Sequence, residues 1–211
     1  MTRPAAVVFD CDGVLVDSEP HSVSSWLAVL GPLGHPATAA DIEACIGLGY
    51  GPTRDALARL GPLPSHEALW PQLLAALGDS YRRGLVLFDD AMAAVAACRR
   101  AGVPTAVATA SPRARLHVTL LSAGLSFDVS VAGDEVAHPK PAPDVYLRAA
   151  ELLGVDPKGC VAVEDTPIGA QSAIAAGMKT VAVVRREADR EALLATGAVV
   201  VDEITPELLG L

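Results

Sequence analysis

Hydrophobic runs without alternating polar positions recur along the chain and predict buried strands. The first run spans residues 5–9, and further runs follow at residues 105–108, 129–131, 160–163 and 180–184, with a weaker one at 199–201. Continuous runs of this kind are typical of parallel strands that are covered on both faces. The pattern therefore predicts a parallel sheet.

Segments of helical length lie between these runs. They span residues 91–101, 112–123, 142–153, 167–176 and 186–195. Ser111 stands directly before a segment that has proline in its first turn, so we expect it to be an N-cap, and Thr166 precedes a similar segment. Alternating strands and helices predict an α/β protein with a doubly wound parallel sheet.

Residues from about 18 to 85 break this alternation, because they contain no convincing strand. Helical patterns cover residues 19–30, 53–60 and 66–81, and Thr38 with Asp41 forms a capping-box-like helix start. We therefore expect an all-helical insertion between the first strand and the rest of the sheet.

Composition narrows the class of function. The chain has 211 residues, 51% of them hydrophobic, and a net charge of −9. This length and hydrophobicity rule out intrinsic disorder, and the acidic excess argues against nucleic acids and anionic membranes as partners. The four cysteines form no CxxC pair, which favours a reduced, cytoplasmic compartment. The N-terminal apolar stretch is too short for a signal peptide or a membrane span.

Two carboxylates, Asp10 and Asp12, directly follow the first predicted strand. Open α/β sheets bind ligands at the carboxyl ends of their strands, and acids are tolerated there when they meet a cation such as Mg²⁺. One carboxylate could attack phosphorus while the other protonates the leaving oxygen. A solvated turn at the end of the strand explains this short motif about as well.

A second acidic pair, Glu164 and Asp165, follows the run at residues 160–163. Two acidic strand ends in one sheet suggest a single cation shared between them. The alternative is that these acids only provide negative charge near a helix N-terminus, which stabilises a helix. That alternative is plausible for this pair alone, but it explains less well why both acidic pairs follow buried strands.

Two further segments carry groups that bind anions. Thr109, Ala110 and Ser111 lie between a predicted strand and a helix start, where a hydroxyl and backbone N–H groups bind phosphate. Lys140 is flanked by two prolines, and it would bind phosphate as a point charge and balance the carboxylates. Taken alone, Ser111 is an ordinary cap and Lys140 an ordinary surface lysine.

The order of these motifs resembles the four motifs of haloacid dehalogenase-like hydrolases. The stretch Asp-Gly-Val-Leu-Val-Asp-Ser-Glu, together with the later Val-Glu-Asp-Thr-Pro-Ile-Gly-Ala, resembles the β-phosphoglucomutase-like phosphatase subgroup. The resemblance covers nearly the whole chain. It implies a Rossmann-like core formed by residues 1–16 and 87–211, with an inserted all-helical cap domain at residues 17–86.

The resemblance also implies a role for each candidate residue. Asp10 would be the nucleophile that forms an aspartyl-phosphate, and Asp12 the general acid and base. The phosphoryl oxygens would be bound by Thr109, Ala110, Ser111 and Lys140. Mg²⁺ would be held by Asp10, the main-chain carbonyl of Asp12, Asp165, and Glu164 either directly or through water. In the cap, Arg54 would contact the substrate, unless it is an arginine of the helix surface.

The function implied is a Mg²⁺-dependent phosphatase for a small phosphorylated metabolite, above all a sugar phosphate, acting as a monomer. The alternatives are a phosphosugar mutase and a catalytically silent phosphate-binding module, and the filled catalytic positions argue against the latter. Mutases of the subgroup carry a histidine five residues after Asp17, where this chain has Ser22. His21 would point about 100° away on a helix, so we favour hydrolysis. Proteins of the subgroup often have Pro-Gly at the second hinge between the cap and the core. This chain has Asp89 and Asp90 there.

Overall fold

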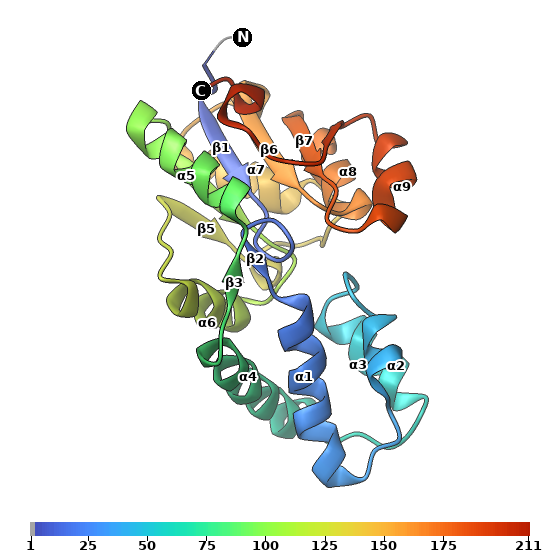
Figure 1. The fold of residues 1–211 in the computed structure, drawn as a ribbon. Coiled ribbons are helices and arrows are strands. Elements are labelled where there is room, and N and C mark those ends of the chain that lie inside the picture. Colours follow the sequence, from blue (N-terminus) through green and yellow to red (C-terminus); the bar gives the residue numbers. More distant parts are fainter. Residues whose placement is uncertain (1–2) are drawn as a thin grey trace. The chain divides into compact units, whose positions relative to one another are not determined.

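A computed structural model describes residues 3–211 of the chain. Two compact units emerge from the contacts between its elements (Figure 1). The first comprises Met1–Val16, Leu87–Arg113 and Ser126–Leu211, and the second comprises Asp17–Val86 and Ala114–Leu125.

The first unit contains a six-stranded sheet with the strand order β5-β4-β1-β6-β7-β8 (Figure 1). All neighbouring strands in it pair in parallel. The strands are β1 (Ala6–Phe9), β4 (Thr105–Ala108), β5 (Val129–Val131), β6 (Cys160–Glu164), β7 (Lys179–Val183) and β8 (Val199–Val201). The strand runs predicted from the sequence are therefore confirmed, with no end displaced by more than one residue.

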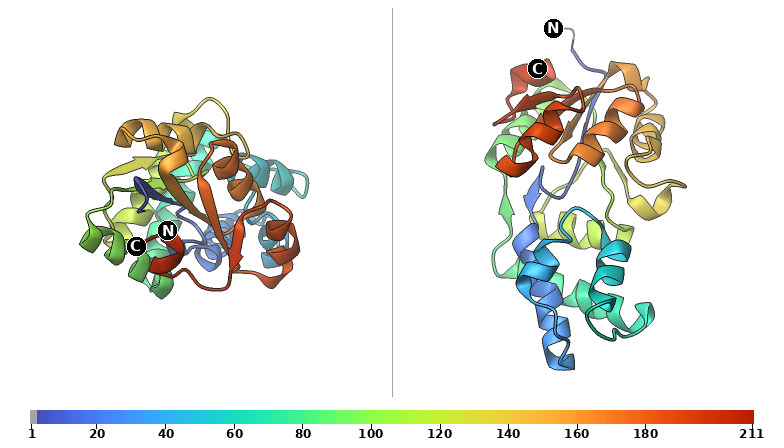
Figure 2. Two further views of the ribbon diagram at one scale, coloured as in Figure 1. Left: turned by 90° about the horizontal axis from the view of Figure 1, so that it is seen from above. Right: turned by 90° about the vertical axis from the view of Figure 1, so that its right-hand side faces the viewer.

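Helices cover both faces of this sheet, as a doubly wound topology requires. In Figure 2, α5 (Asp89–Ala101) lies on one side of the sheet, and α7 (Asp144–Leu153) and α8 (Pro167–Ala175) lie on the other. The predicted helix at residues 186–195 is shorter in the structure. It consists of a 3₁₀ turn, Glu187–Asp189, followed by α9 (Arg190–Leu194).

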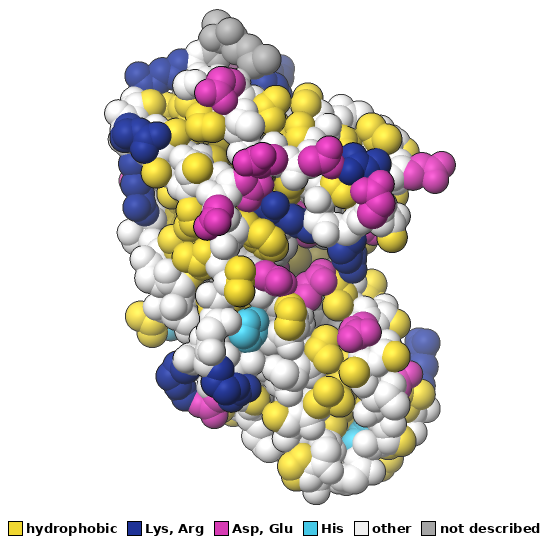
Figure 3. Space-filling model, in the orientation of Figure 1, with side chains coloured by type: hydrophobic (Ala, Val, Ile, Leu, Met, Phe, Trp, Pro, Cys, Tyr) yellow, Lys and Arg dark blue, Asp and Glu magenta, His cyan; other side chains and the backbone are white. Residues whose placement is uncertain are grey.

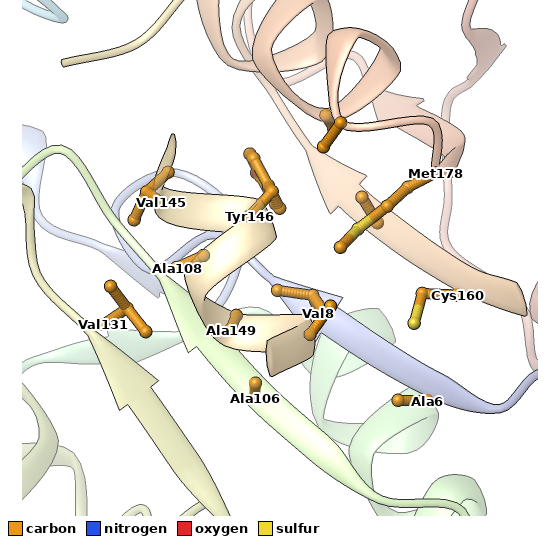
Figure 4. Packing of buried hydrophobic residues seen from close by; sticks show 14 residues of the cluster. Ala6, Val8, Ala106, Ala108, Val131, Val145, Tyr146, Ala149, Cys160 and Met178 are labelled. Carbon is orange, nitrogen blue, oxygen red and sulfur yellow. The ribbon is translucent and has the colours of Figure 1, made fainter. Parts of the chain in front are cut away.

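Small residues allow the helices to pack closely on the sheet. In Figure 4, Val8 and Ala106 from the sheet face Val145, Tyr146 and Ala149 of α7. Alternate strand residues point to opposite faces of a sheet, so this cluster uses every second residue of each strand. Tyr146 is fully buried in it and is its largest side chain. Its hydroxyl therefore needs a hydrogen-bond partner inside the protein.

The second unit is helical, as expected for the insertion. It contains α1 (Glu19–Leu30), α2 (Ala39–Glu43), α3 (Tyr50–Ala58) and α4 (His66–Arg82), which share a hydrophobic core. The predicted capping box at the start of α2 is confirmed. The Asp41 N–H donates to Thr38 Oγ1 at 3.3 Å, and the Thr38 N–H donates to Asp41 Oδ2 at 2.8 Å.

Helix α6 (Arg113–Ala123) groups with these helices, whereas the sequence analysis placed it in the core domain. Two long-range contacts explain this grouping. The hydroxyl of Tyr81 lies 3.3 Å from Thr119 Oγ1, and Arg115 Nη2 donates to Ser22 Oγ at 2.9 Å. Contacts between residues so far apart in the sequence leave no local pattern.

Two short strands lie where the chain passes between the units. β2 (Val16–Asp17) and β3 (Val86–Leu87) form a separate two-stranded sheet. These strands were not predicted from the sequence, because two residues are too few to show a hydrophobic period.

The surface carries charges of both signs. On the face seen in Figure 3, lysine and arginine side chains stand among acidic ones and do not gather into one basic patch. Within residues 3–211, we find no helix with the length and apolar character that crossing a membrane requires. All four cysteines are buried, and none of them forms a disulfide within the part of the chain that the structure describes.

Candidate active site

Three adjacent strands bring the predicted site residues to one edge of the sheet. Asp10 directly follows β1, Thr109 follows β4, and Asp165 follows β6, and β1 lies between the other two strands. The Asp10 N–H donates to the Val163 carbonyl at 2.9 Å, which extends the sheet pairing to the carboxylate itself. The carboxyl ends of parallel strands thus collect residues that lie far apart in the sequence.

Three carboxylates form a buried cluster at this edge. Asp10, Glu164 and Asp165 each offer an oxygen, and these oxygens lie within 4.8 Å of one another. Lys140 reaches the cluster from the loop before α7. Its Nζ donates to Asp10 Oδ1 at 2.8 Å, to Glu164 Oε1 at 2.5 Å and to the Ala108 carbonyl at 3.1 Å. One ammonium therefore faces three carboxylates, which leaves an excess of negative charge.

Burial and charge shift the protonation of this cluster. Burial raises the pKa of Asp10, Lys140 opposes the rise and Glu164 adds to it, so that the pKa reaches about 7. Burial alone would lower the pKa of Lys140, but the carboxylates of Asp10 and Glu164 outweigh it and raise this pKa. Lys140 thus remains protonated, and a further cation would favour the ionised form of Asp10.

The Glu164 carboxylate is held by protein donors on both oxygens. Oε1 accepts from Lys140 and from the Tyr146 hydroxyl, the latter at 2.7 Å. Oε2 accepts from the Asp165 N–H at 3.1 Å, the Thr166 hydroxyl at 3.2 Å and the Thr166 N–H at 3.4 Å. A carboxylate has about four lone-pair sites. These donors therefore occupy the hydrogen-bonding capacity of Glu164 and fix its orientation.

Two glycines allow backbone to approach the acidic side chains. Gly13 has φ +83°, and a Cβ on it would lie 2.0 Å from Asp165 Oδ2. A Cβ on Gly169 would lie 2.0 Å from Glu164 Oε1. Any side chain at either position would displace a carboxylate. The cluster is therefore a built cradle of oxygen ligands, which are the type that Mg²⁺ takes.

Asp12 lies outside this group of three carboxylates. Its Oδ2 accepts a hydrogen bond from Ser111 Oγ at 2.7 Å. The prediction that Ser111 is an N-cap is wrong, because α6 begins at Arg113, whose N–H donates to Asp134 Oδ1 at 2.8 Å. The Ser111 hydroxyl is engaged by Asp12 instead, and so it orients the predicted acid and base.

The anion-binding segment predicted at residues 109–111 forms a compact turn. The Ser111 N–H donates to Thr109 Oγ1 at 3.1 Å, and Thr109 itself is buried. Ala110 between them is exposed. This places an exposed residue next to a fixed hydroxyl.

The predicted cap residue Arg54 belongs to the second unit, on α3. Its Nη2 donates to the Pro64 carbonyl at 3.1 Å. Its Nε is buried and has no hydrogen-bond partner among the residues that the structure describes. The carboxylate cluster and Lys140 lie in the first unit, so the two groups of predicted residues belong to different units.

Ser22 and His21 both lie on α1, but their side chains contact different residues. Ser22 accepts the hydrogen bond from Arg115, whereas His21 Nδ1 lies 2.8 Å from Ser80 Oγ and its ring packs edge-on against Tyr81. Burial lowers the pKa of His21, which favours its neutral form.

Tyr146 was not predicted from the sequence as part of the site. Its hydroxyl lies beside Glu164 and Lys140, although the residue itself stands on the apolar face of α7. The only signal was a tyrosine among small hydrophobic residues in the predicted helix. A buried tyrosine of this kind usually indicates a polar partner, but not which one.

Known proteins resemble this chain in sequence and in fold. The chain is 37% identical over 184 residues to fructose-1-phosphate phosphatase YqaB of Escherichia coli (strain K12), a match covering 85% of this chain and 96% of that protein. It is 33% identical over 188 residues to Protein SUPPRESSOR OF QUENCHING 1, chloroplastic, of Arabidopsis thaliana, which covers 86% of this chain but only 18% of that protein's length. A HAD family hydrolase from Deinococcus radiodurans R1, solved with bound phosphate and sodium, superimposes with a TM-score of 0.73 at 29% identity, covering 97% of this chain and 92% of the other.

The family assignment follows from a match that extends over most of the chain. The family model of haloacid dehalogenase-like hydrolases matches residues 4–177. That segment includes all four motifs, from Asp10 to Asp165, and the whole helical insertion. The resemblance found in the motifs is therefore confirmed, and the chain belongs to the haloacid dehalogenase-like hydrolases.

Proposed function

We propose that the chain is a Mg²⁺-dependent phosphatase that hydrolyses a small phosphorylated sugar through an aspartyl-phosphate on Asp10. The observation that carries the proposal is the cluster of three buried carboxylates within 4.8 Å, with Lys140 bonded to two of them. The similarity to a fructose-1-phosphate phosphatase over nearly the full length of that protein supports the substrate class.

The residues present suit a magnesium ion. Asp10, Asp165 and the main-chain carbonyl of Asp12 would hold it, and their oxygens are ligands that Mg²⁺ prefers. The negative charge that Lys140 leaves uncompensated suits a divalent cation. Glu164 would act through water, because protein donors already occupy both of its oxygens. When bound, the ion would reduce the repulsion between the Asp10 carboxylate and the phosphoryl group.

In the first step, Thr109, the Ala110 amide and Lys140 would bind the phosphoryl oxygens. A carboxylate oxygen of Asp10 attacks phosphorus, and the bond between phosphorus and the leaving oxygen breaks. Asp12 gives its proton to that oxygen, so the alcohol leaves neutral. The hydrogen bond from Ser111 keeps the Asp12 carboxyl oriented during this transfer.

In the second step, water attacks the phosphorus of the acyl phosphate. Asp12, now ionised, takes a proton from this water, and the Asp10 carboxylate leaves as inorganic phosphate forms. Both residues return to their starting protonation states. The same two carboxyl groups therefore serve both halves of the reaction.

The serine at position 22 favours hydrolysis over phosphoryl transfer back to a sugar. A serine there, bonded to Arg115, cannot provide the near-neutral proton exchange of an imidazole. His21 is engaged by Ser80 and Tyr81 and does not replace it. We therefore propose water as the acceptor.

We also propose that Arg54 contributes to recognition of the part of the substrate that does not react. Arg54 is half-buried, and its guanidinium has further N–H donors besides the one bonded to the Pro64 carbonyl, which a polar ligand would accept from.

The test is phosphate release from p-nitrophenyl phosphate and from a panel of hexose and ketose phosphates, with added Mg²⁺ and with EDTA. We expect release with Mg²⁺ and loss of activity in EDTA. In parallel, β-glucose 1-phosphate with a trace of the bisphosphate tests the mutase alternative. Formation of glucose 6-phosphate with little free phosphate would overturn the proposal, as would full activity in EDTA.

A further inference from the structure

Arg185 and the Phe88 N–H bond from outside to the turn that follows Asp12, the latter to the Leu15 carbonyl at 3.1 Å. Within the turn, the Gly13 N–H donates to the Val16 carbonyl at 2.9 Å, and the Leu15 N–H donates to the Cys11 carbonyl at 3.0 Å. The carbonyls of Gly13 and Val14 instead accept hydrogen bonds from Arg185. Its Nε lies 3.0 Å from the Gly13 oxygen, and its Nη2 lies 3.4 Å from the Val14 oxygen.

Arg185 is in turn anchored by Asp90 at the start of α5. Nη1 donates to Oδ2 at 3.1 Å and Nη2 to Oδ1 at 2.8 Å, while the guanidinium lies 3.8 Å from the centre of the Phe88 ring. The two side chains are only 16% and 8% exposed. Such a planar two-point pair fixes the direction of the guanidinium as well as its place.

Asp90 is itself fixed by two backbone amides. The Ala91 N–H donates to Oδ1 at 2.8 Å, and the Ile204 N–H donates to Oδ2 at 3.0 Å. The clamp formed by Arg185 and Asp90 thus connects four segments of the first unit: the turn after Asp12, the start of α5, the chain after β7 and the chain after β8. None of these residues has a role in the proposed reaction.

We infer that Arg185, anchored on Asp90, is a positioning residue that fixes the turn carrying Asp12 for proton transfer. The inference rests on the proposed function and deepens it. Asp12 directly precedes Gly13, so a shift of the Gly13 carbonyl moves the acid and base. The same shift would also disturb Asp165, because Gly13 packs against its carboxylate with no room for a Cβ.

A lysine cannot replace Arg185 in this role. The guanidinium makes two hydrogen bonds to Asp90 and two to the turn carbonyls in fixed directions. An ammonium is a point donor without that planar fork. Arg185→Lys should therefore behave like Arg185→Met, although it keeps the charge.

The test compares these variants with the wild-type enzyme in hydrolysis of p-nitrophenyl phosphate. Misplacement of a catalytic group by about 1 Å can cost about a hundredfold in rate. We expect kcat to fall by about tenfold to a hundredfold, with KM within about twofold, because the clamp fixes the turn after Asp12, whereas Thr109, Ala110 and Lys140, which would bind the phosphoryl oxygens, lie outside that turn. Arg186→Met is the matched control, since the neighbouring Arg186 pairs with Asp189 at 2.7 Å and is 40% exposed. The control should retain wild-type kcat.

Removal of Arg185 alone leaves the buried Asp90 charge without its partner, which can unfold a protein. The double variant Arg185→Met with Asp90→Asn removes both charges, and it should show the same loss of kcat. Hydrogen exchange provides a readout that does not depend on activity. Exchange in the segment 10–17 should become faster in the double variant and stay unchanged in Arg186→Met.

Wild-type kcat in the double variant, or an unchanged exchange rate at residues 10–17, would overturn the inference. A general rise in exchange over the whole first unit would also overturn it, because that pattern indicates a structural role only. If the wild-type protein releases no phosphate from any ester, the proposed function fails. The exchange measurement then decides by itself whether Arg185 holds the turn.

Discussion

Removal of the Tyr146 hydroxyl should destabilise the protein more than removal of a similarly buried hydroxyl elsewhere. Tyr146 is fully buried, and its hydroxyl donates to Glu164 Oε1 at 2.7 Å. Lys140 Nζ lies 3.4 Å from the same hydroxyl oxygen and 4.9 Å from the ring centre. Glu164 is only 1% exposed, so water cannot easily replace the lost donor.

The expected cost follows from the charge of the acceptor. Hydrogen bonds to charged groups contribute about 1.5–3 kcal/mol to stability, and those between neutral groups about 0.5–1.5 kcal/mol. Tyr146→Phe should therefore lower the free energy of unfolding by about 1.5–3 kcal/mol. Tyr81→Phe is the matched control, because Tyr81 is 3% exposed and its hydroxyl lies 3.3 Å from the neutral Thr119 hydroxyl. Its expected cost is about 0.5–1.5 kcal/mol.

The assay is urea denaturation of the three proteins, followed by circular dichroism at neutral pH in EDTA. The free energy of unfolding is extrapolated to water for each protein. Similar slopes of the free energy against urea concentration show that the three proteins expose similar surface areas on unfolding. An equal or smaller loss for Tyr146→Phe than for Tyr81→Phe would refute the reasoning. It would mean that the bond to Glu164 is not strengthened by a buried negative charge.

Four further outcomes are expected. Asp10→Asn should abolish phosphate release while circular dichroism stays unchanged, and retention of more than a few per cent of the activity would remove Asp10 as the nucleophile. Without substrate, Mg²⁺ should raise the melting temperature of the wild-type protein more than that of Asp165→Asn, and equal shifts would argue against a metal at Asp165. Burial raises the pKa of Asp10 from 3.8 to about 7, so between these values the folded chain keeps a proton that the unfolded chain releases. In EDTA, the free energy of unfolding of the wild-type protein relative to Asp10→Asn should therefore fall as pH rises through this range, and a flat difference would contradict the shift. Arg54→Ala should raise KM for a sugar phosphate much more than for p-nitrophenyl phosphate, whereas equal effects would indicate a surface arginine.

The parallel sheet and the acidic strand ends could be predicted because both leave local patterns. A strand buried on both faces reads as an unbroken hydrophobic run, so β1, β4 and β6 were evident in the sequence. The residues after such runs stand at the carboxyl edge of the sheet, which brought Asp10 and Asp165 together as candidates.

Contacts between distant segments could not be predicted in this way. Ser111 was expected to cap a helix, but its hydroxyl bonds to Asp12, 99 residues earlier in the chain. Arg185 stands 95 residues from Asp90 and 172 from Gly13, and nothing in its neighbouring sequence indicates either partner. The tertiary fold determines which residues a single polar side chain contacts, so its role cannot be predicted from its neighbours in the sequence. For the same reason, the sequence did not show that α6 groups with the helical insertion.

The central claim is that the phosphoryl group is carried covalently on Asp10, and chemical trapping tests it most directly. The enzyme is mixed with a phosphate ester and Mg²⁺, quenched with acid during turnover, reduced with borohydride, and digested for mass spectrometry. Borohydride converts an aspartyl-phosphate to the corresponding alcohol but leaves a free carboxylate intact. We predict conversion at Asp10, dependent on substrate and metal and absent in Asp10→Asn. Turnover without any conversion at Asp10, or conversion at another carboxylate, would contradict the proposed mechanism.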